Sequence, residues 1–319
     1  MKLDKNFFFS KLDKMGFFEN KPHVAVAVSG GPDSMALVYL TKKWTAKKKG
    51  KTTALIFDHK IRENSYQEAL ETKKILKKLK INSIILKAKK QSVKKKNMSE
   101  ARNNRFDGLM NYCKKNNILH LFLGHHLDDN LETYLIRFIQ GSNFEGLRAM
   151  SESKIINKIN FYRPFINIPK KSILDFNKNN FINYLDDPSN SDLIYTRVKV
   201  RNFLSNTNYR KEIVSDFANI KNQMPYYKKM ILETLINSVV VIRNKFCIIK
   251  LNDLIENDNL ILEKHIQLIL GFFAYEKNKT KISKIRLFTK ELEKSSFKTF
   301  NLSGIIIRKN RDLLEFSEN

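Results

Sequence analysis

The chain has 319 residues, which is enough for about two domains with sizeable cores. Lysine and arginine number 59 against 32 acidic residues, and the net charge of +27 makes nucleic acid the first partner to consider, although a lysine-rich composition alone could explain part of the excess. The two isolated cysteines, Cys113 and Cys247, exclude a disulfide framework, and no export signal or long apolar segment is present, so we expect a cytoplasmic protein without a membrane span.

Strands and helices are expected to alternate along the first part of the chain. Residues 1–20 have apolar side chains at helical spacing and predict a short helix packed on the domain that follows. Strands are expected at 24–28, 52–57, 81–86 and 118–123, with helices after the first three, including 66–80 and 99–116. This alternation is typical of an α/β fold with a parallel sheet and right-handed crossovers.

The pattern changes near residue 210. Beyond it the periodicity is mainly helical, including residues 231–242 and 257–275, and the chain ends in a predicted β-hairpin over 298–316. We therefore expect an N-terminal helix (1–20), a catalytic α/β domain (21–209) and a smaller, mainly helical domain (210–319) that docks RNA. Ordinary solvated faces are an equally good explanation of the basic residues in this last domain.

The first strand runs into a turn that is suited to bind phosphate. Gly30 and Gly31 are two of only ten glycines, and adjacent glycines indicate positive φ or a ligand that approaches the backbone closely. Consecutive N–H groups there, the Ser34 hydroxyl and the positive end of the following helix could together hold an anion. An ordinary turn capped by Asp33 or Ser34 is the alternative.

The complete string is more specific than the glycine pair. Ser29-Gly30-Gly31-Pro32-Asp33-Ser34 resembles the PP-loop of the N-type ATP pyrophosphatases, which cleave ATP to AMP and pyrophosphate. It is not a Walker A loop, because no lysine follows that could reach the β- and γ-phosphates. The resemblance favours adenylation over phosphoryl transfer, makes the whole string a candidate ATP site and makes Asp33 the expected carboxylate for Mg²⁺.

Polar clusters also follow two later strands. Asp58 and His59 come directly after the second strand, and His125 to Asp129 follow the fourth. Ligands of open α/β sheets bind outside the carboxyl ends of the strands, so these clusters and the PP-loop should converge on one crevice. A helix cap and a surface histidine explain Asp58 and His59 equally well. The 125–129 cluster lacks a clear third zinc ligand, which favours magnesium.

An ordered set of motifs over about residues 21–205 resembles the tRNA(Ile)-lysidine synthetase family. Besides the PP-loop, the matching segments are residues 58–65, 101–106, 125–133, 140–147, 163–165 and 186–190, followed by Arg197 and Arg201. The resemblance implies an adenine nucleotide alpha hydrolase-like, Rossmann-like PP-loop ATPase domain. It also implies an ATP-dependent ligase that joins free L-lysine to C2 of the wobble cytidine of a CAU-anticodon isoleucine tRNA, through an adenylated base, giving lysidine, AMP and pyrophosphate.

The resemblance assigns roles to particular residues. Asp33, Arg105, His125 and Asp129 are the expected catalytic residues. Arg105 would stabilise the transferring phosphate, and Asp33 and Asp129 would hold Mg²⁺. The implied ATP site is the PP-loop string together with Asp58 and His59, and the implied tRNA contacts are Arg163, Arg197, Arg201 and the lysine-rich stretch 87–97. The expected partners are tRNA, ATP and L-lysine, and a homodimer is left open.

Two other functions compete with this one. A tRNA thiolase of the same superfamily would need a cysteine pair, which Cys113 and Cys247 do not form in the sequence. A basic RNA-binding protein with a vestigial PP-loop would not need the acidic residues Asp33, Asp58 and Asp129. ATP-dependent release of pyrophosphate would exclude this second alternative.

Overall fold

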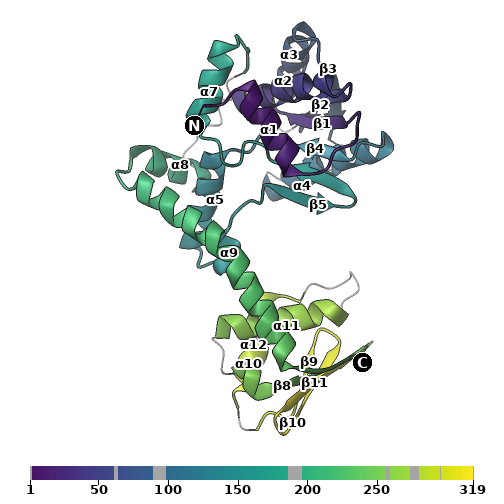
Figure 1. Cartoon of the computed structure of the whole chain (residues 1–319), viewed down its shortest axis with the longest axis vertical. Coiled ribbons are helices and arrows are strands. Elements are labelled where there is room, and N and C mark those ends of the chain that lie inside the picture. Colours follow the sequence, from purple (N-terminus) through teal and green to yellow (C-terminus); the bar gives the residue numbers. More distant parts are fainter. Residues whose placement is uncertain are drawn as a thin grey trace. The chain divides into compact units, whose positions relative to one another are not determined.

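The computed structural model describes residues 2–60, 64–88, 98–185, 196–243, 245–255, 259–273, 280–294 and 296–318. The chain divides into two compact units, Met1–Phe217 and Ala218–Asn319 (Figure 1). The division lies inside helix α9 (Arg210–Ser238) and not at its start, because the first turns of α9 pack on the first unit. Among the described helices, none is long and apolar enough to cross a membrane.

The first unit is built on a six-stranded sheet in which the expected parallel strands are confirmed. Its strands are β1 (His23–Val28), β2 (Lys51–Asp58), β3 (Asn82–Lys87), β4 (His120–Phe122), β5 (Ser153–Ile156) and β6 (Ile159–Tyr162). Their order is β3-β2-β1-β4-β6-β5, and all neighbouring pairs are parallel except β5 with β6. The short β5–β6 hairpin was not predicted from the sequence. The central strand β1 lies between β2 and β4, so the loops after β1 and β4 leave the same edge of the sheet side by side.

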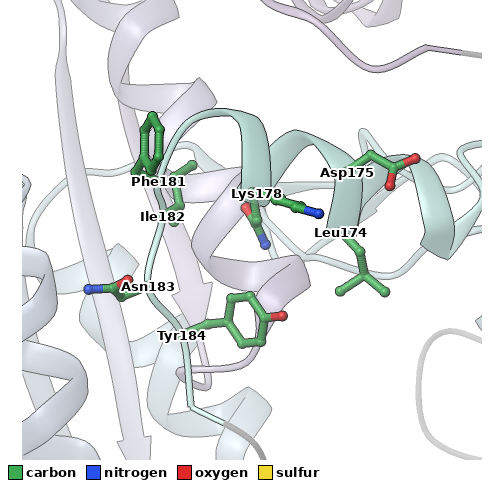
Figure 2. Close-up of a pocket in the computed structure, with 8 residues that line it drawn as sticks. Leu174, Asp175, Lys178, Phe181, Ile182, Asn183 and Tyr184 are labelled. Carbon is green, nitrogen blue, oxygen red and sulfur yellow. The ribbon is translucent and has the colours of Figure 1, made fainter.

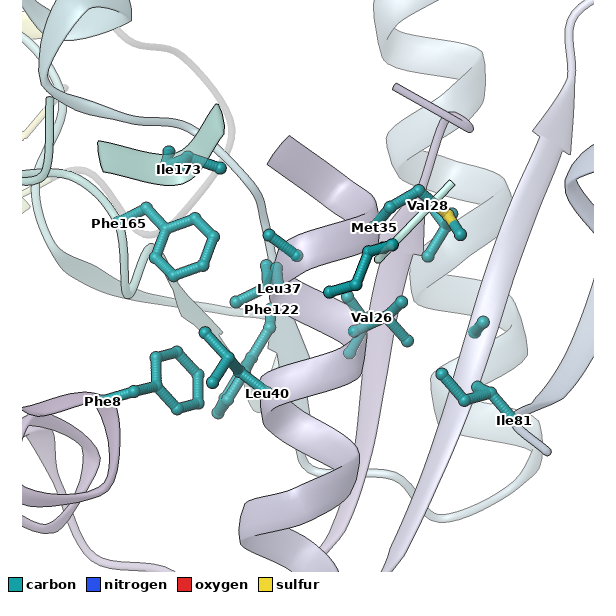
Figure 3. Close-up of a cluster of buried hydrophobic side chains, with 14 of the residues drawn as sticks. Phe8, Val26, Val28, Met35, Leu37, Leu40, Ile81, Phe122, Phe165 and Ile173 are labelled. Atoms are coloured by element: carbon teal, nitrogen blue, oxygen red, sulfur yellow. The ribbon is translucent and has the colours of Figure 1, made fainter. Parts of the chain in front are cut away.

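Helices pack around this sheet. They are α1 (Lys5–Met15), α2 (Pro32–Lys47), α3 (Ser65–Lys78), α4 (Met98–Lys115), α5 (Leu127–Ile139), α6 (Phe144–Leu147), α7 (Lys170–Asn179) and α8 (Thr196–Asn206). One face of α1 buries Phe8 and Leu12 in the core, and Figure 3 shows Phe8 near Phe165, with ring centroids 5.8 Å apart. The same core holds Met35, Leu37 and Leu40 of α2, which fixes the first turn of α2 against β1.

The second unit contains a sheet that was not predicted from the sequence. Its elements are β7 (Val239–Arg243), β8 (Phe246–Lys250), α10 (Leu251–Ile255), α11 (Asn259–Phe273), α12 (Ile282–Leu292), β9 (Thr299–Leu302), β10 (Ile305–Asn310) and β11 (Leu313–Glu318). The expected terminal hairpin is β10–β11, and it belongs to an antiparallel sheet of order β7-β8-β11-β10-β9. The helix expected over 231–242 ends at Ser238, because the β-branched run Val239 to Ile242 enters the sheet instead. The unit therefore has the expected helices and terminal hairpin, and the hairpin is part of a larger antiparallel sheet.

Candidate active site

The turn after β1 has the backbone geometry of a phosphate-binding loop. Gly30 has φ +91°, and a Cβ atom there would lie 2.5 Å from the Thr72 hydroxyl, so this position requires glycine. The Ser34 hydroxyl donates to the Gly31 carbonyl at 3.0 Å and accepts from the Ser29 amide at 3.2 Å, which closes the turn. Helix α2 begins at Pro32 directly after it, and the first N–H groups of a helix lack intrahelical acceptors. The turn can therefore hold an anionic ligand.

The loop after β4 meets this turn. A Cβ atom on Gly124 would lie 3.3 Å from backbone atoms of Asp33 and Ser34, so the two chain segments are close to contact. Beyond Gly124, His126 accepts from the Asp129 amide at 3.4 Å, while the Asp129 carboxylate accepts from the His126 amide at 3.0 Å. This reciprocal cap starts α5 and directs the Asp129 carboxylate toward the turn.

Asp33 and Asp129 gather around one imidazole ring, as the position of their loops at the sheet edge predicts. His126 Nε2 lies 3.7 Å from Asp33 Oδ2 and 3.4 Å from Asp129 Oδ2. Burial alone would raise the pKa of Asp129, but the neighbouring histidines and Arg197 outweigh burial and lower this pKa. Asp129 is therefore ionised at neutral pH. Sequence reasoning had not assigned a role to His126, although its position between two predicted site residues was a usable signal.

A lysine that the sequence did not predict completes this group. Lys170 is the first residue of α7, and its Nζ lies 2.6 Å from each carboxylate oxygen of Asp33. The Lys170 amide also donates to Asp128 Oδ2 at 2.8 Å. The N-terminus of a helix carries partial positive charge, which is unfavourable for a lysine in the first turn. A carboxylate that compensates this charge was therefore to be expected near Lys170. The sequence could not identify which carboxylate it is.

Asp129 also lies near His125, which is close to the three arginines Arg163, Arg105 and Arg102. The side chain of His125 is half-buried, with Nδ1 shielded from solvent, and burial lowers its pKa to about 3; Asp129 opposes this shift, and Arg163, Arg105 and Arg102 add to it. Burial, together with the charge of Arg102, also lowers the pKa of Arg105 and of Arg163. Within the described residues, Nε of both of these arginines and Nδ1 of His125 are buried and have no hydrogen-bond partner. Buried donors without acceptors are costly, so this cluster is suited to an anion.

Arg197 and Arg201 are paired within the protein. Their Nε atoms each donate to the fully buried carboxylate of Glu132 at 2.7 Å, and Arg197 Nη2 lies 3.5 Å from Asp129 Oδ1. Arg210 similarly pairs with Asp128. These contacts fix α8 and the start of α9 on α5, with the outer edges of the arginines left exposed. Glu132 was missed, although it follows Asp129 by one helical turn and so shares a face with it.

The second predicted cluster has a clear structural role. Asp58 is buried, and its Oδ1 accepts from the Lys60 amide at 2.9 Å and from the Ser65 hydroxyl at 2.7 Å, which orders the entry to α3. The ring of His59 packs on Phe57 with centroids 4.9 Å apart. Asp58 thus orders the loop, but in the part of the chain that the structure describes it does not cap α3: the N-cap is Asn64, which makes no side-chain capping hydrogen bond. Most of the lysine-rich stretch 87–97 and the motif at 186–190 lie outside the described residues.

A shallow pocket of about 380 Å³ lies beside the turn (Figure 2). It is lined by α7 and the segment that follows, and no sequence-predicted site residue is among the described residues that line it. Two hydrogen bonds connect its walls to the turn: Asn177 donates to the Pro32 carbonyl at 2.9 Å, and the Leu185 amide donates to the Gly30 carbonyl at 3.0 Å. These bonds hold the turn against α7 and the segment after it, whereas the ionisable groups lie at the sheet edge.

The donor set fits a phosphate-bound magnesium ion better than a resident metal. Among the described residues, no group of three or more His, Cys, Asp or Glu side chains could hold a metal ion. Magnesium typically uses one or two carboxylates together with substrate phosphates, and Asp33 and Asp129 supply these carboxylates on either side of His126. The ammonium group on Asp33 shows that this carboxylate already attracts a cation.

The fold and the site define a nucleotide-binding domain of the PP-loop class. The family described as the PP-loop domain matches residues 5–208. A solved structure of the U34-tRNA thiolase from Methanococcus maripaludis shares the fold, with a TM-score of 0.56 and 19% identity over 68% of this chain and 78% of that chain.

Relatives narrow this class further. A tRNA(Ile)-lysidine synthase from Wolbachia pipientis wMel is 30% identical over 313 residues, which cover 95% of this chain and 71% of the relative. Another, from Orientia tsutsugamushi (strain Boryong), is 36% identical over 206 residues, which cover 64% of this chain and 46% of the relative. The chain belongs to the tRNA(Ile)-lysidine synthase family. It spans about half the length of the Orientia relative that it matches.

Proposed function

We propose that this chain ligates free L-lysine to C2 of the wobble cytidine of an isoleucine tRNA with a CAU anticodon, using ATP. The observation that carries the proposal is the convergence of three groups at one edge of the sheet in a PP-loop domain. These groups are the phosphate-binding turn, the Asp33–His126–Asp129 cluster and the buried arginines around His125. We further propose that the protein works in the cytoplasm, where ATP and tRNA are found.

In the first step, the C2 oxygen of the cytidine attacks the α-phosphorus of ATP, and pyrophosphate leaves. The turn amides and the Ser34 hydroxyl would hold the phosphates, and Arg105, with its buried Nε free of a partner among the described residues, would stabilise the charge of the transferring group. Asp33 and Asp129 would hold Mg²⁺, which when bound neutralises phosphate charge. The cytidine must leave its stack to reach this site.

In the second step, the ε-amine of lysine attacks C2 and AMP leaves. The amine must first lose a proton, and its ordinary pKa is about 10.4. His125 is a poor base for this step, because its pKa is lowered to about 3, so we assign it a hydrogen-bonding role as a neutral imidazole. His126 lies between the two carboxylates and is the better-placed group to relay the proton. The carboxylate of Asp129 would attract the ammonium group before it is deprotonated.

The tRNA is proposed to bind through the basic surface. Arg197 and Arg201 use Nε on Glu132, and their Nη2 atoms also contact Asp129 and Glu132. Among the described contacts, this leaves Nη1 of each arginine for phosphates. If about six phosphate contacts are made in all, tRNA affinity should fall about a thousandfold between 50 and 200 mM salt. Filter binding over this range measures the fall. A flat salt response would contradict a phosphate-dominated surface and favour composition bias as the cause of the charge.

The cysteines argue against the thiolase alternative. Cys113 and Cys247 are both buried and belong to different units. Burial raises the pKa of Cys113 to about 12 and that of Cys247 to about 11, so both remain protonated at neutral pH. Sulfur transfer uses the thiolate, which neither residue provides.

The experiment that tests the adenylation step uses ATP labelled at the α-phosphate, without lysine. We expect label on the isoleucine tRNA together with pyrophosphate release, and loss of both in Asp33→Asn. Asp107→Asn, which changes an exposed aspartate on α4, is the matched control and should retain both. Pyrophosphate release that does not require tRNA, with no label on the tRNA, would contradict the proposed step.

A further inference from the structure

The side chain of Lys170 occupies the position where a cation is expected at the PP-loop. Its Nζ lies 2.6 Å from both carboxylate oxygens of Asp33, although the two residues are 137 positions apart in the chain. The side chains of Lys170 and Asp33 are 32% and 25% exposed, so a ligand in solution can reach both. The PP-loop itself contains no lysine.

The base of the Lys170 side chain is held firmly. Its amide donates to Asp128 Oδ2 at 2.8 Å, Ile173 is buried in the core, and Asn177 donates to the Pro32 carbonyl at 2.9 Å. Helix α7 is therefore attached to α5 at the lysine itself and to the start of α2 about two helical turns further on. The long lysine side chain can still change its direction from this fixed point, because its charge sits on a flexible four-carbon stem.

We propose that Lys170 is the phosphate-binding lysine of this site and that it exchanges partners when nucleotide binds. Before binding, its ammonium neutralises Asp33; with ATP bound, it moves to oxygens of the β- or γ-phosphate and leaves Asp33 to magnesium. The ammonium and a magnesium ion compete for the single negative charge of Asp33, because two cations held by one carboxylate repel each other. The inference rests on the proposed use of ATP, and it assigns to α7 the role that a Walker A loop gives to its own lysine.

The competing explanation is a permanent ion pair that only joins α7 to α2. The two explanations differ in what removal of the charge does to nucleotides of different length. A phosphate-binding lysine contributes to ATP, which carries β- and γ-phosphates, and hardly to AMP, which ends at the α-phosphate. A purely structural pair would change the affinity for both nucleotides equally or for neither.

The test is equilibrium binding of ATP and AMP to the full chain by calorimetry, with magnesium and without tRNA or lysine. We expect K170M to weaken ATP binding by about tenfold to a hundredfold, as for a lost hydrogen bond to a charged group, and to leave AMP binding within about twofold. K170R should restore most of the ATP affinity. K171M is the matched control, because Lys171 is exposed on the same turn, and it should bind like the wild type.

A second measurement, of metal binding, should show a gain in affinity where the first shows a loss. With Asp33 relieved of its ammonium partner, K170M should bind Mn²⁺ more tightly than the wild type in the absence of nucleotide, and the added substitution D33N should remove the gain. Equal effects on ATP and AMP, or unchanged ATP affinity, would overturn the inference. If K170M does not fold, K170Q carries the same expectations. A wild-type chain that binds no ATP would contradict the proposed function instead, so the two failures are distinguishable.

Discussion

The two units of the chain differ in what they bury. The first unit buries carboxylates, Asp58 and Glu132, and a cluster of histidines and arginines at the carboxyl edge of its sheet. Among the described residues of the second unit, the buried polar side chains are Ser238, His265 and Thr289, with no carboxylate. Buried charge is unfavourable unless it is paired, so the first unit gives up stability to hold ionisable groups together, whereas the second is built around an apolar core.

The ion pairs show the same contrast. Glu132 is fully buried beneath Arg197 and Arg201, whereas in the second unit Glu263 keeps 12% of its side chain exposed and its partner Arg286 keeps 52%. Burial lowers the pKa of both His125 and His265, but only His125 lies among arginines and a carboxylate. The comparison predicts that substitutions in the first unit alter function and stability strongly, and that their counterparts in the second unit do not.

The largest expected effect is on catalysis. Asp129→Ala removes a carboxylate from the cluster around His126, and we expect transfer of AMP to tRNA to fall by about a thousandfold. Binding of tRNA should remain nearly intact, because the basic surface is unchanged. Single-turnover transfer of labelled AMP and filter binding measure the two quantities. Normal transfer with lost tRNA binding would contradict the role of Asp129.

The next effect is on stability. Glu132→Ala leaves two arginines without their shared partner, and because these are partly exposed we expect unit 1 to lose about 2 kcal/mol. Trp44, the only tryptophan, is buried in unit 1, so its fluorescence during denaturant unfolding reports on that unit. Glu263→Ala in unit 2 should leave the Trp44 transition unchanged. If Glu132→Ala and Glu263→Ala shift the midpoint of the Trp44 transition equally, the proposed difference between the two units is wrong.

The smallest effect is on pH dependence. Burial lowers the pKa of His125 in the folded chain to about 3, whereas the unfolded chain protonates this residue near pH 6.5. Its contribution to stability is therefore complete above about pH 6.5 and declines as the pH falls toward 3, with about 1.4 kcal/mol lost at pH 5.5. His125→Gln should show a correspondingly shallower decline of the Trp44 transition. An unchanged slope would mean that His125 is not neutral in the folded state.

The sequence predicted features formed by neighbouring residues, and it did not predict individual contacts between residues far apart in the chain. The PP-loop string is contiguous, and the strand-end rule placed Asp33 and Asp129 in one crevice, where the structure finds them around His126. The pairing of Lys170 with Asp33 joins elements far apart in sequence and depends on how α7 packs on α2. No local pattern contains such information.

The ion-pair partner of two arginines and the pairing of β7 with β8 could not be predicted, because both depend on contacts with a second segment of the chain. Arg197 and Arg201 were predicted as surface contacts, but their buried partner Glu132 became evident only when α8 was placed against α5. In the second unit, the periodicity of residues 231–242 suits a helix throughout, yet strand pairing with β8 takes over from Val239. Tertiary pairing outweighs local propensity at such boundaries.

The most direct test of the proposed ligase is incorporation of labelled lysine into tRNA with ATP and magnesium. The substrates are an isoleucine tRNA transcript with a CAU anticodon and, beside it, a methionine tRNA with the same anticodon. We predict that only the isoleucine tRNA is labelled, which requires both the reaction and discrimination by the tRNA body. Equal labelling of both would contradict the discrimination, and no labelling of either, with an active control enzyme, would contradict the ligase function.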